Sequence, residues 1–322
     1  MRAITMRRYG GPQVLELAEI EAPRPAAGEV LIRVEAAAVS AGDVLIMHGE
    51  PRMIRLAFGL AAPRQPVIGR DVAGEVAAVG AGVTRFAVGD RVFAESDQAG
   101  WAEYATVPER FVALRPASVD AVHAAAVPVS GTTALQGLRL AGLRPGQRLL
   151  VNGASGGVGG FVVQLGVAMG AEVTGVCRGT KAEHVRALGA HEVIDHTRED
   201  FTARAGAFDV VFDLVADHPL GRVRRSLVRD GMLVLSSGRG GTVTGPLGRL
   251  AVASVVSPFV PQRLRPLAAK RSGEDLTELA RRIDAGDLRP VVDAVFPLER
   301  AAEAVRRFEA GDVRGKLVLA VA

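Results

Sequence analysis

The sequence predicts an α/β protein in which a mostly antiparallel β domain is followed by a doubly wound parallel-sheet domain. Residues 1–122 consist of short strand-like runs separated by turns, which is typical of antiparallel sheets. In residues 123–262, apolar strands alternate with helical patterns. This alternation requires right-handed crossovers and therefore a parallel sheet. Residues 263–322 return to the first domain.

The first domain is read from runs of apolar residues bounded by glycine, proline and aspartate. Turns are marked at 10–12, 80–82 and 88–90. The predicted strands are 1–6, 15–17, 29–37, 72–79, 91–94 and 102–107. Their short length and regular spacing favour a β domain without long helices.

In the second domain and in residues 263–322, the spacing of apolar residues changes between the period of a helix and that of a strand. Helices are expected at 124–126 and 132–140, from the glycine turn to about 170, and at 181–188, 274–285 and 298–310. Strands are expected at 148–151, 172–177, 192–194, 210–214, 232–236, 291–296 and 316–321.

Composition limits the class of protein. A chain of 322 residues with 48% hydrophobic and 23% charged residues is globular and has room for two domains. It has no 18-residue apolar run, and residues 1–8 lack the apolar core of a signal peptide, so we expect a cytoplasmic protein. The single Cys177 excludes an internal disulfide and a cysteine-clustered metal site. The net charge of +4 comes from scattered arginines, so no nucleic-acid partner is expected.

A glycine-rich turn follows the first strand of the second domain. It matches the dinucleotide fingerprint as Ala154-x-Gly156-x-x-Gly159, with alanine at the first glycine position. Gly156 lets a pyrophosphate approach the backbone, and Gly159 lets the helix pack on the strand. The helix N-terminus behind the turn favours an anion. We therefore expect cofactor contacts at Ser155, Gly156, Gly157 and Val158.

The residues after the second strand of this domain indicate which nucleotide binds. An NAD-preferring site needs a carboxylate about 20 residues beyond the last glycine. Counting 178 − 159 = 19 reaches Arg178, with Thr180 and Lys181 close behind. A guanidinium and an ammonium bind a 2′-phosphate, which a carboxylate would repel, so the sequence predicts NADPH. His196 is predicted to stack on adenine or to contact that phosphate. A solvated loop is the alternative for these positions.

Ligands of open parallel sheets bind outside the carboxyl ends of the strands. Two later strands end at positions that should border the nicotinamide half of the cofactor. The predicted contacts there are Leu214, Val215, Ser236, Ser237 and Gly238.

Several motifs together resemble the medium-chain dehydrogenase/reductase superfamily, and within it the zinc-free quinone oxidoreductase branch. They are YGGPQVL at 9–15, VIGRDVAG at 67–74, GDRVF at 89–93, the glycine turn with Gln164, and GKLV at 315–318. The resemblance implies a GroES-like catalytic domain, a Rossmann domain and a cofactor between them. It also implies that Thr132 lies at the nicotinamide, that Lys316 contacts the cofactor, and that the protein is a homodimer. A helix N-cap is the alternative for Thr132.

Residues 245–268 are apolar with interspersed arginines. The resemblance implies that they line the substrate entrance or a dimer interface. Weak contact with an anionic membrane surface is one alternative, and a plain surface helix is another.

The zinc ligands of the zinc-dependent relatives are replaced here. Ser40 stands at the position of a cysteine ligand, and Gly69-Arg70-Asp71 stands where those relatives have Gly-His-Glu. A hydroxyl and a cation cannot replace a thiolate and an imidazole, so we expect no metal. Nothing then stabilises the alkoxide that alcohol oxidation requires. Reduction of a conjugated acceptor is the expected reaction, since hydrogen bonds can stabilise the charge that gathers on its oxygen.

Three residues are the catalytic candidates. Ser40 and Asp43 match a family Asn-x-x-Asp segment beside the nicotinamide, with serine in place of asparagine. Arg70 would orient an acidic substrate, stabilise an oxyanion, or pair with Asp43 or Asp71 as part of the structure. Leu45 stands where some relatives have a tyrosine proton donor, which leaves His48 or water as donors.

The sequence thus predicts an NADPH-dependent, zinc-independent reductase of a quinone or an α,β-unsaturated carbonyl. One alternative is a dedicated enoyl or enone reductase of a biosynthetic pathway, with Arg70 recognising a carboxylate or phenolate. Another is an NADPH-binding protein without turnover.

Overall fold

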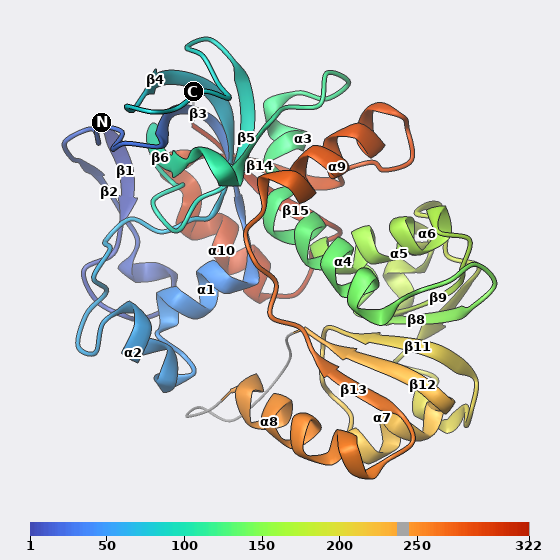
Figure 1. Ribbon diagram of the computed structural model, residues 1–322. Helices are drawn as coiled ribbons and strands as arrows, with labels where there is room; N and C mark the ends of the chain where they lie inside the picture. Colours follow the sequence, from blue (N-terminus) through green and yellow to red (C-terminus); the bar gives the residue numbers. More distant parts are fainter. Residues whose placement is uncertain (237–244, 322) are drawn as a thin grey trace. The chain divides into compact units, whose positions relative to one another are not determined.

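The computed structural model describes residues 1–236 and 245–321, and the chain forms two compact units (Figure 1). Unit 1 contains residues 1–132 and the C-terminal part of the chain from Arg271 onward. Unit 2 contains residues 133–270. Helix α4 (Pro128–Ala141) runs across the boundary between them.

Unit 1 is built on a seven-stranded sheet with the order β14-β15-β3-β4-β5-β7, and β6 also pairs with β3. All of these pairs are antiparallel except β14 with β15. Strands β1 and β2 form a separate antiparallel pair. The strands are β1 (Arg2–Thr5), β2 (Glu16–Glu19), β3 (Glu29–Val39), β4 (Asp71–Val79), β5 (Arg91–Glu95), β6 (Tyr104–Pro108), β7 (Val112–Leu114), β14 (Val292–Pro297) and β15 (Lys316–Ala320). The helices are α1 (Ala41–His48), α2 (Arg55–Phe58), α3 (Ala121–Ala125), α9 (Gly273–Asp284) and α10 (Ala301–Glu309).

The core of unit 1 follows the alternation of its strands. Val30, Ile32 and Val34 point from β3 to one face and are fully buried, because successive side chains of a strand alternate between faces. Helix α10 adds the buried side of an amphipathic helix to the same core. Trp101 is buried within it, and its indole Nε1 donates a hydrogen bond to the carbonyl oxygen of Ala38 at 3.2 Å.

Unit 2 contains six parallel strands in the order β10-β9-β8-β11-β12-β13. The strands are β8 (Arg148–Asn152), β9 (Glu172–Cys177), β10 (Glu192–Asp195), β11 (Phe208–Asp213), β12 (Leu227–Leu235) and β13 (Arg263–Pro266). The helices are α5 (Gly157–Ala168), α6 (Ala182–Ala187), α7 (Leu220–Ser226) and α8 (Pro246–Val256). In chain order this is 3-2-1-4-5-6, the doubly wound arrangement whose order reverses between β8 and β11. The loops after these two strands are therefore where such sheets bind a ligand.

The predicted fold class is confirmed. The parallel sheet and the mostly antiparallel sheet both lie where the two changes of sequence pattern place them. The sequence does not predict three of the helices, α1, α2 and α7, or two of the strands, β7 and β13. The segment 263–266 was expected to belong to the C-terminal return, but it forms β13, because its backbone pairs with β12 from Met232 to Leu235. The boundaries between the two units lie C-terminal of residues 122 and 262, since α3 packs on β3 and β4 and β13 extends the parallel sheet.

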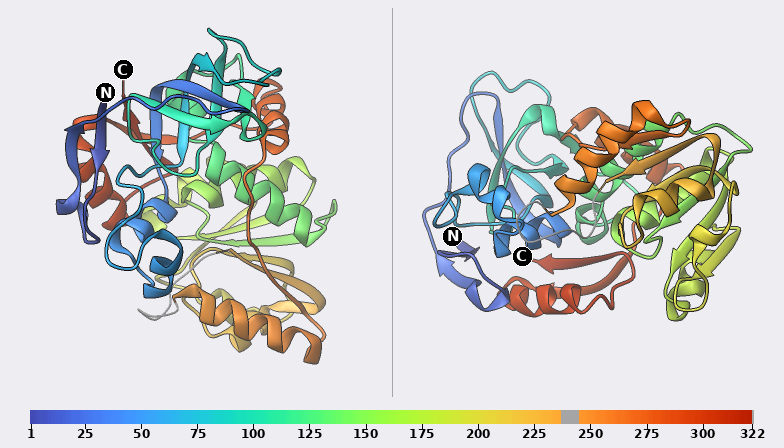
Figure 2. Two further views of the ribbon diagram at one scale, coloured as in Figure 1. Left: turned by 60° about the vertical axis from the view of Figure 1, so that its left-hand side comes forward. Right: turned by 90° about the horizontal axis from the view of Figure 1, so that it is seen from below.

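Helix α8 runs beside β13 (Figures 1 and 2). It carries several exposed apolar side chains. Leu247, Val252 and Val255 are exposed on it, and Phe259 just beyond its end is 84% exposed. A helix surface of this kind is compatible with the expected interface. The homodimer and the membrane-surface contact remain predictions. Among residues 1–236 and 245–321, no helix combines the length and the apolar character that are needed to cross a bilayer.

Candidate functional site

The glycine turn of unit 2 joins β8 to α5. Gly153 has a φ of +93°, which favours glycine, and Gly156 is the N-cap of α5 with an extended backbone. A Cβ on Gly159 would overlap the carbonyl oxygen of Gly153. A Cβ on Gly156 would meet nothing closer than that same oxygen, at 3.6 Å. The fold therefore requires glycine at 159 but not at 156, which agrees with a ligand as the reason for Gly156.

The residues after β11 lie against this turn. A Cβ on Gly153 would come within 3.0 Å of Val215 Cγ2 and 3.4 Å of Leu214 Cβ, so the structure brings these predicted contacts to the turn. Asp213 at the end of β11 is fully buried. Its carboxylate accepts hydrogen bonds from Asn152 Nδ2 at 2.9 Å, from two backbone N–H groups of its own loop, and from an arginine of α8, Arg249, at 2.8 Å.

Asp213 and Arg249 were missed in the sequence. Asp213 could have been found from the sequence, because it ends an apolar strand next to the position where the strand order reverses. Together with the turn and the N-terminus of the 12-residue helix α5, these loops fit a bound dinucleotide pyrophosphate. Ser155, Gly156, Gly157 and Val158 lie in this turn or in the first residues of α5. Ser236 follows β12, whereas Ser237 and Gly238 lie outside the described residues.

The end of β9 carries the residues that were assigned to the 2′-phosphate. Arg178 and Thr180 are exposed, whereas Lys181 is buried. The N–H of His196 donates to the carbonyl oxygen of Cys177 at 3.1 Å, which places His196 beside the end of β9. Asp195, at the end of β10, was not considered in the sequence. Its carboxylate accepts hydrogen bonds from the N–H and the hydroxyl of Thr197, which lower its pKa.

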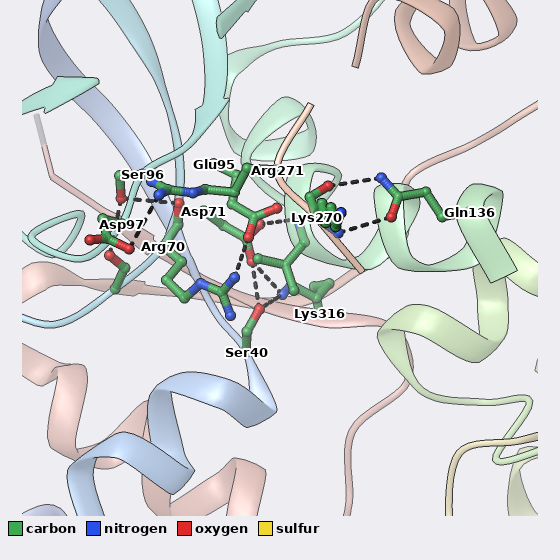
Figure 3. A network of polar contacts seen from close by, with 12 residues as sticks. Ser40, Arg70, Asp71, Glu95, Ser96, Asp97, Gln136, Lys270, Arg271 and Lys316 are labelled. Atoms are coloured by element: carbon green, nitrogen blue, oxygen red, sulfur yellow. Dashed lines mark hydrogen bonds and ion pairs between the residues drawn. The ribbon is translucent and has the colours of Figure 1, made fainter. Parts of the chain in front are cut away.

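The catalytic candidates of unit 1 lie in a group of polar side chains that we call the charged cluster: Ser40, Asp43, Arg70, Asp71, Glu95 and Lys316. Figure 3 labels all of these residues except Asp43. Figure 3 shows Ser40, Asp71 and Lys316 pointing toward one another. Ser40 Oγ donates to Asp71 Oδ2 at 2.5 Å and accepts from Lys316 Nζ at 2.5 Å. Lys316 Nζ also donates to Asp71 Oδ2 at 2.8 Å, and the N–H of Val129 donates to Asp71 Oδ1 at 2.6 Å.

Arg70 pairs with a residue that the sequence did not suggest. Its Nη2 forms an ion pair with Glu95 Oε1. Among the described residues, no ion pair joins Arg70 to Asp43 or Asp71, although the charges of both help to raise the pKa of Arg70. Ser40, Lys316 and Val129 supply the hydrogen bonds to Asp71. Asp71 and Glu95 are opposite each other in the β4–β5 register, which brings Glu95 next to Arg70. Glu95 could not be found from the sequence without that register.

Asp43 lies in the first turn of α1 and is fully buried. Its Oδ2 accepts a hydrogen bond from the N–H of Ser40 at 2.8 Å, which satisfies a free donor at the helix N-terminus. Oδ1 has no hydrogen-bond partner within the part of the chain that the structure describes. Burial, and next the negative charge of Asp71, raise the pKa of Asp43 to about 7, although Arg70 and Lys316 act in the opposite direction. At neutral pH this carboxyl is therefore protonated about half of the time.

Three further candidates have defined surroundings. Lys316, expected as a cofactor contact, places its ammonium in the charged cluster. Thr132 lies inside α4 rather than at its start, so the N-cap alternative is wrong. Its hydroxyl is buried and finds no partner among the described residues, which leaves the prediction of a cofactor contact open.

His48 was named as a possible proton donor. Its Nε2 lies 2.5 Å from Oε1 of Glu309 on α10.

The charged cluster does not fit a zinc ion. Ser40 supplies a hydroxyl and Arg70 a guanidinium, and the ammonium of Lys316 is bonded to Ser40 and Asp71. Zinc in proteins is bound by thiolate, imidazole and carboxylate groups. No group of three or more His, Cys, Asp or Glu side chains within residues 1–236 and 245–321 has a geometry that could hold a metal.

Comparison with known proteins places this geometry in a family. A family model described as alcohol dehydrogenase GroES-like domain matches residues 26–117, and one described as zinc-binding dehydrogenase matches residues 188–319. The chloroplast envelope quinone oxidoreductase homolog of Arabidopsis thaliana is 32% identical over 333 residues, covering 99% of this chain and 98% of that one. The chain belongs to the medium-chain dehydrogenase/reductase family, in its quinone oxidoreductase-like branch.

Two further members of this family are informative. The NADPH-dependent alkenal/one oxidoreductase of Arabidopsis thaliana is 32% identical over 333 residues, covering 99% of this chain and 79% of its own. The solved structure of the quinone oxidoreductase from Coxiella burnetii matches with a TM-score of 0.88 at 28% identity, covering 100% of this chain and 99% of the other. The protein is an oxidoreductase of this family, and the parallel sheet of unit 2 is its dinucleotide-binding type of domain.

Two substitutions in the glycine turn should separate folding from cofactor binding. Gly159→Ala forces a Cβ against backbone atoms, so we expect a loss of about 3 kcal/mol in the free energy of unfolding. Gly156→Ala has room, so we expect a loss below about 1 kcal/mol but a fall in dinucleotide affinity on the order of tenfold. Urea unfolding and fluorescence titration measure the two effects. Equal stability losses in both variants would contradict this assignment.

Asp43 should make stability depend on pH. Because its pKa is raised from 3.8 to about 7, the folded protein holds a proton that the unfolded chain has already lost. The contribution of Asp43 to the free energy of unfolding is therefore most favourable below pH 4, and it declines as pH rises to about 7. Between pH 5.5 and 8 the decline is about 2 kcal/mol. Asp43→Asn should remove this decline in thermal unfolding at the two pH values, whereas Asp97→Asn, at a side chain that is 88% exposed, should retain it.

Proposed function

We propose that the protein is an NADPH-dependent reductase that transfers hydride to a quinone or an α,β-unsaturated carbonyl without zinc. The observation that carries the proposal is the charged cluster, in which the hydroxyl of Ser40 and the guanidinium of Arg70 occupy positions of the family's metal ligands and Lys316 adds a second cation. The names of relatives support the substrate class, since they include quinone oxidoreductases and an alkenal/one oxidoreductase.

Each unit has a separate task in this proposal. NADPH, when bound, supplies the hydride. In unit 2, the glycine turn and α5 hold the pyrophosphate, and Arg178 and Thr180 hold the 2′-phosphate. In unit 1, Arg70 has N–H groups that Glu95 leaves available to bind negative charge on the acceptor. Lys316 and Asp71 fix the position of the Ser40 hydroxyl.

Zinc independence follows from the same donor set. Reduction of a conjugated acceptor places its charge on an oxygen that hydrogen-bond donors can stabilise, so a Lewis acid is not required. Arg70 and Lys316 supply fixed positive charge in unit 1. Their side chains are held by Glu95 and Asp71, so little reorganisation is needed when the acceptor becomes charged.

A steady-state screen tests the function. For reduction, purified protein is mixed with NADPH or NADH and with either 1,4-naphthoquinone or a 2-alkenal. For oxidation, it is mixed with NADP⁺ and a simple primary alcohol. We expect NADPH oxidation with the quinone or the alkenal, no alcohol oxidation, and activity that persists with a chelator present. Stoichiometric zinc in active protein would overturn the zinc assignment. Tight NADPH binding without oxidation by any acceptor would favour a binding protein without turnover.

Arg178 tests the choice of nucleotide. Arg178→Asp replaces a cation with a carboxylate that repels the 2′-phosphate and accepts ribose hydroxyls. We expect the ratio of kcat/KM for NADPH to kcat/KM for NADH to fall by at least about tenfold, which is about 1.4 kcal/mol. Arg229→Asp is the matched control, because Arg229 is exposed near the beginning of β12. An unchanged ratio in Arg178→Asp would show that the 2′-phosphate is bound elsewhere.

A further inference from the structure

The charged cluster contains two cations and three carboxylates, and their contacts divide them into two pairs and one remaining acid. Lys316 pairs with Asp71, and Arg70 pairs with Glu95. Asp43 remains, with one hydrogen bond from a backbone N–H. An unbalanced buried charge is expensive, and a carboxyl avoids it by taking up a proton. With Asp43 neutral, the charged cluster carries no net charge.

The exposed part of the charged cluster is cationic. The side chain of Arg70 is 29% exposed, whereas the side chains of Glu95, Lys316 and Asp71 are 6%, 5% and 0% exposed. A ligand that reaches the charged cluster therefore contacts the guanidinium of Arg70 first. The carboxylates of Glu95 and Asp71 are more deeply buried than this guanidinium.

The contact with Glu95 uses only one nitrogen of the guanidinium. Nη2 of Arg70 contacts Glu95 Oε1, and no other hydrogen bond of this side chain is found among the described residues. A Cβ on Gly42 would lie 3.2 Å from Arg70 Nη1, so the guanidinium extends over the first turn of α1. Arginine has a planar set of donors that matches a carboxylate, and here part of that set is available to a ligand.

Stability alone does not account for the pair. Burying an ion pair gives little net stability, because desolvation offsets the attraction between the charges. The partly exposed guanidinium over Gly42 is better explained by a ligand that shares it. The ligand must be anionic and planar at its contact point, as a carboxylate or a phenolate is.

We propose that the acceptor of this protein carries a carboxylate or phenolate and that Arg70 binds this anion, beside the first turn of α1 that holds Asp43. The proposal rests on the proposed function only in treating the bound anion as the molecule that accepts hydride. The binding of an anion at Arg70 stands on the contacts of unit 1.

The surroundings of Asp43 determine how pH should act on this binding. The charged groups near it are Asp71 from β4, Arg70 just before that strand, and Lys316 from β15. As pH rises through about 7, Asp43 ionises and the charged cluster gains a negative charge close to the bound anion. Anion affinity should therefore be higher at pH 6 than at pH 8.

A matched pair of acceptors tests the proposal directly. The enone 4-oxopent-2-enoate carries a carboxylate, and its methyl ester has the same five-carbon enone part without the charge. We expect wild-type kcat/KM for the acid to exceed that for the ester by at least about tenfold. Arg70→Gln should bring the ratio close to one, and Arg70→Lys should retain part of it. A wild-type ratio near or below one, or a ratio that Arg70→Gln leaves unchanged, would overturn the proposal. The wild-type comparison stands even if a variant fails to fold.

Direct binding separates this inference from the proposed function. Calorimetric titration of the wild-type protein with 4-oxopent-2-enoate should show saturable binding that the methyl ester does not show. Such binding without NADPH oxidation would contradict the reductase function and still support the anion site. NADPH oxidation by neutral acceptors without binding of 4-oxopent-2-enoate would support the reductase function and contradict the anion site.

The same titration tests Asp43. Wild-type affinity for the acid should fall by on the order of tenfold between pH 6 and pH 8. Asp43→Asn should bind the acid with an affinity that changes little over this range. A variant that keeps the full pH dependence would exclude Asp43 as the group that controls it.

Discussion

The Asp71 carboxylate lies where four separate segments of unit 1 meet. Ser40 follows β3, Asp71 begins β4, Val129 belongs to α4, and Lys316 begins β15. A fully buried carboxylate is strongly unfavourable unless donors surround it. Here three donors reach it, at 2.5 Å, 2.6 Å and 2.8 Å. This one requirement holds the ends of three neighbouring strands and a helix in a fixed arrangement.

The strand register explains why these residues meet. Leu317 pairs with Val39 between β15 and β3, so the residues next to them, Lys316 and Ser40, lie together at the same end of the sheet. Ala38 pairs with Asp71 between β3 and β4. Asp71 pairs in turn with Glu95 on β5. One end of the antiparallel sheet thus brings together Ser40, Asp71, Glu95 and Lys316.

Unit 2 solves a similar problem with a different carboxylate. Asp213 is fully buried and accepts hydrogen bonds from Asn152, from two N–H groups of its own loop and from Arg249. It thereby joins the end of β8 to the end of β11 and holds α8 nearby. The glycine turn can be tight because Gly159 has no Cβ to strike Gly153. Both units therefore use a buried, fully bonded carboxylate beside the loops that are proposed to bind ligands.

The sequence alone was sufficient for the fold class, for most strands and for the glycine turn, because period, turn residues and the spacing to Arg178 are local properties of the chain. The partners of the charged residues were not accessible in this way. Arg70 and Glu95 are 25 residues apart, and Ser40 and Lys316 are 276 residues apart. Strand register decides such contacts, as it decided that 263–266 extends the parallel sheet. The raised pKa of Asp43 likewise depends on burial and on Asp71, which only the packed tertiary structure brings beside it.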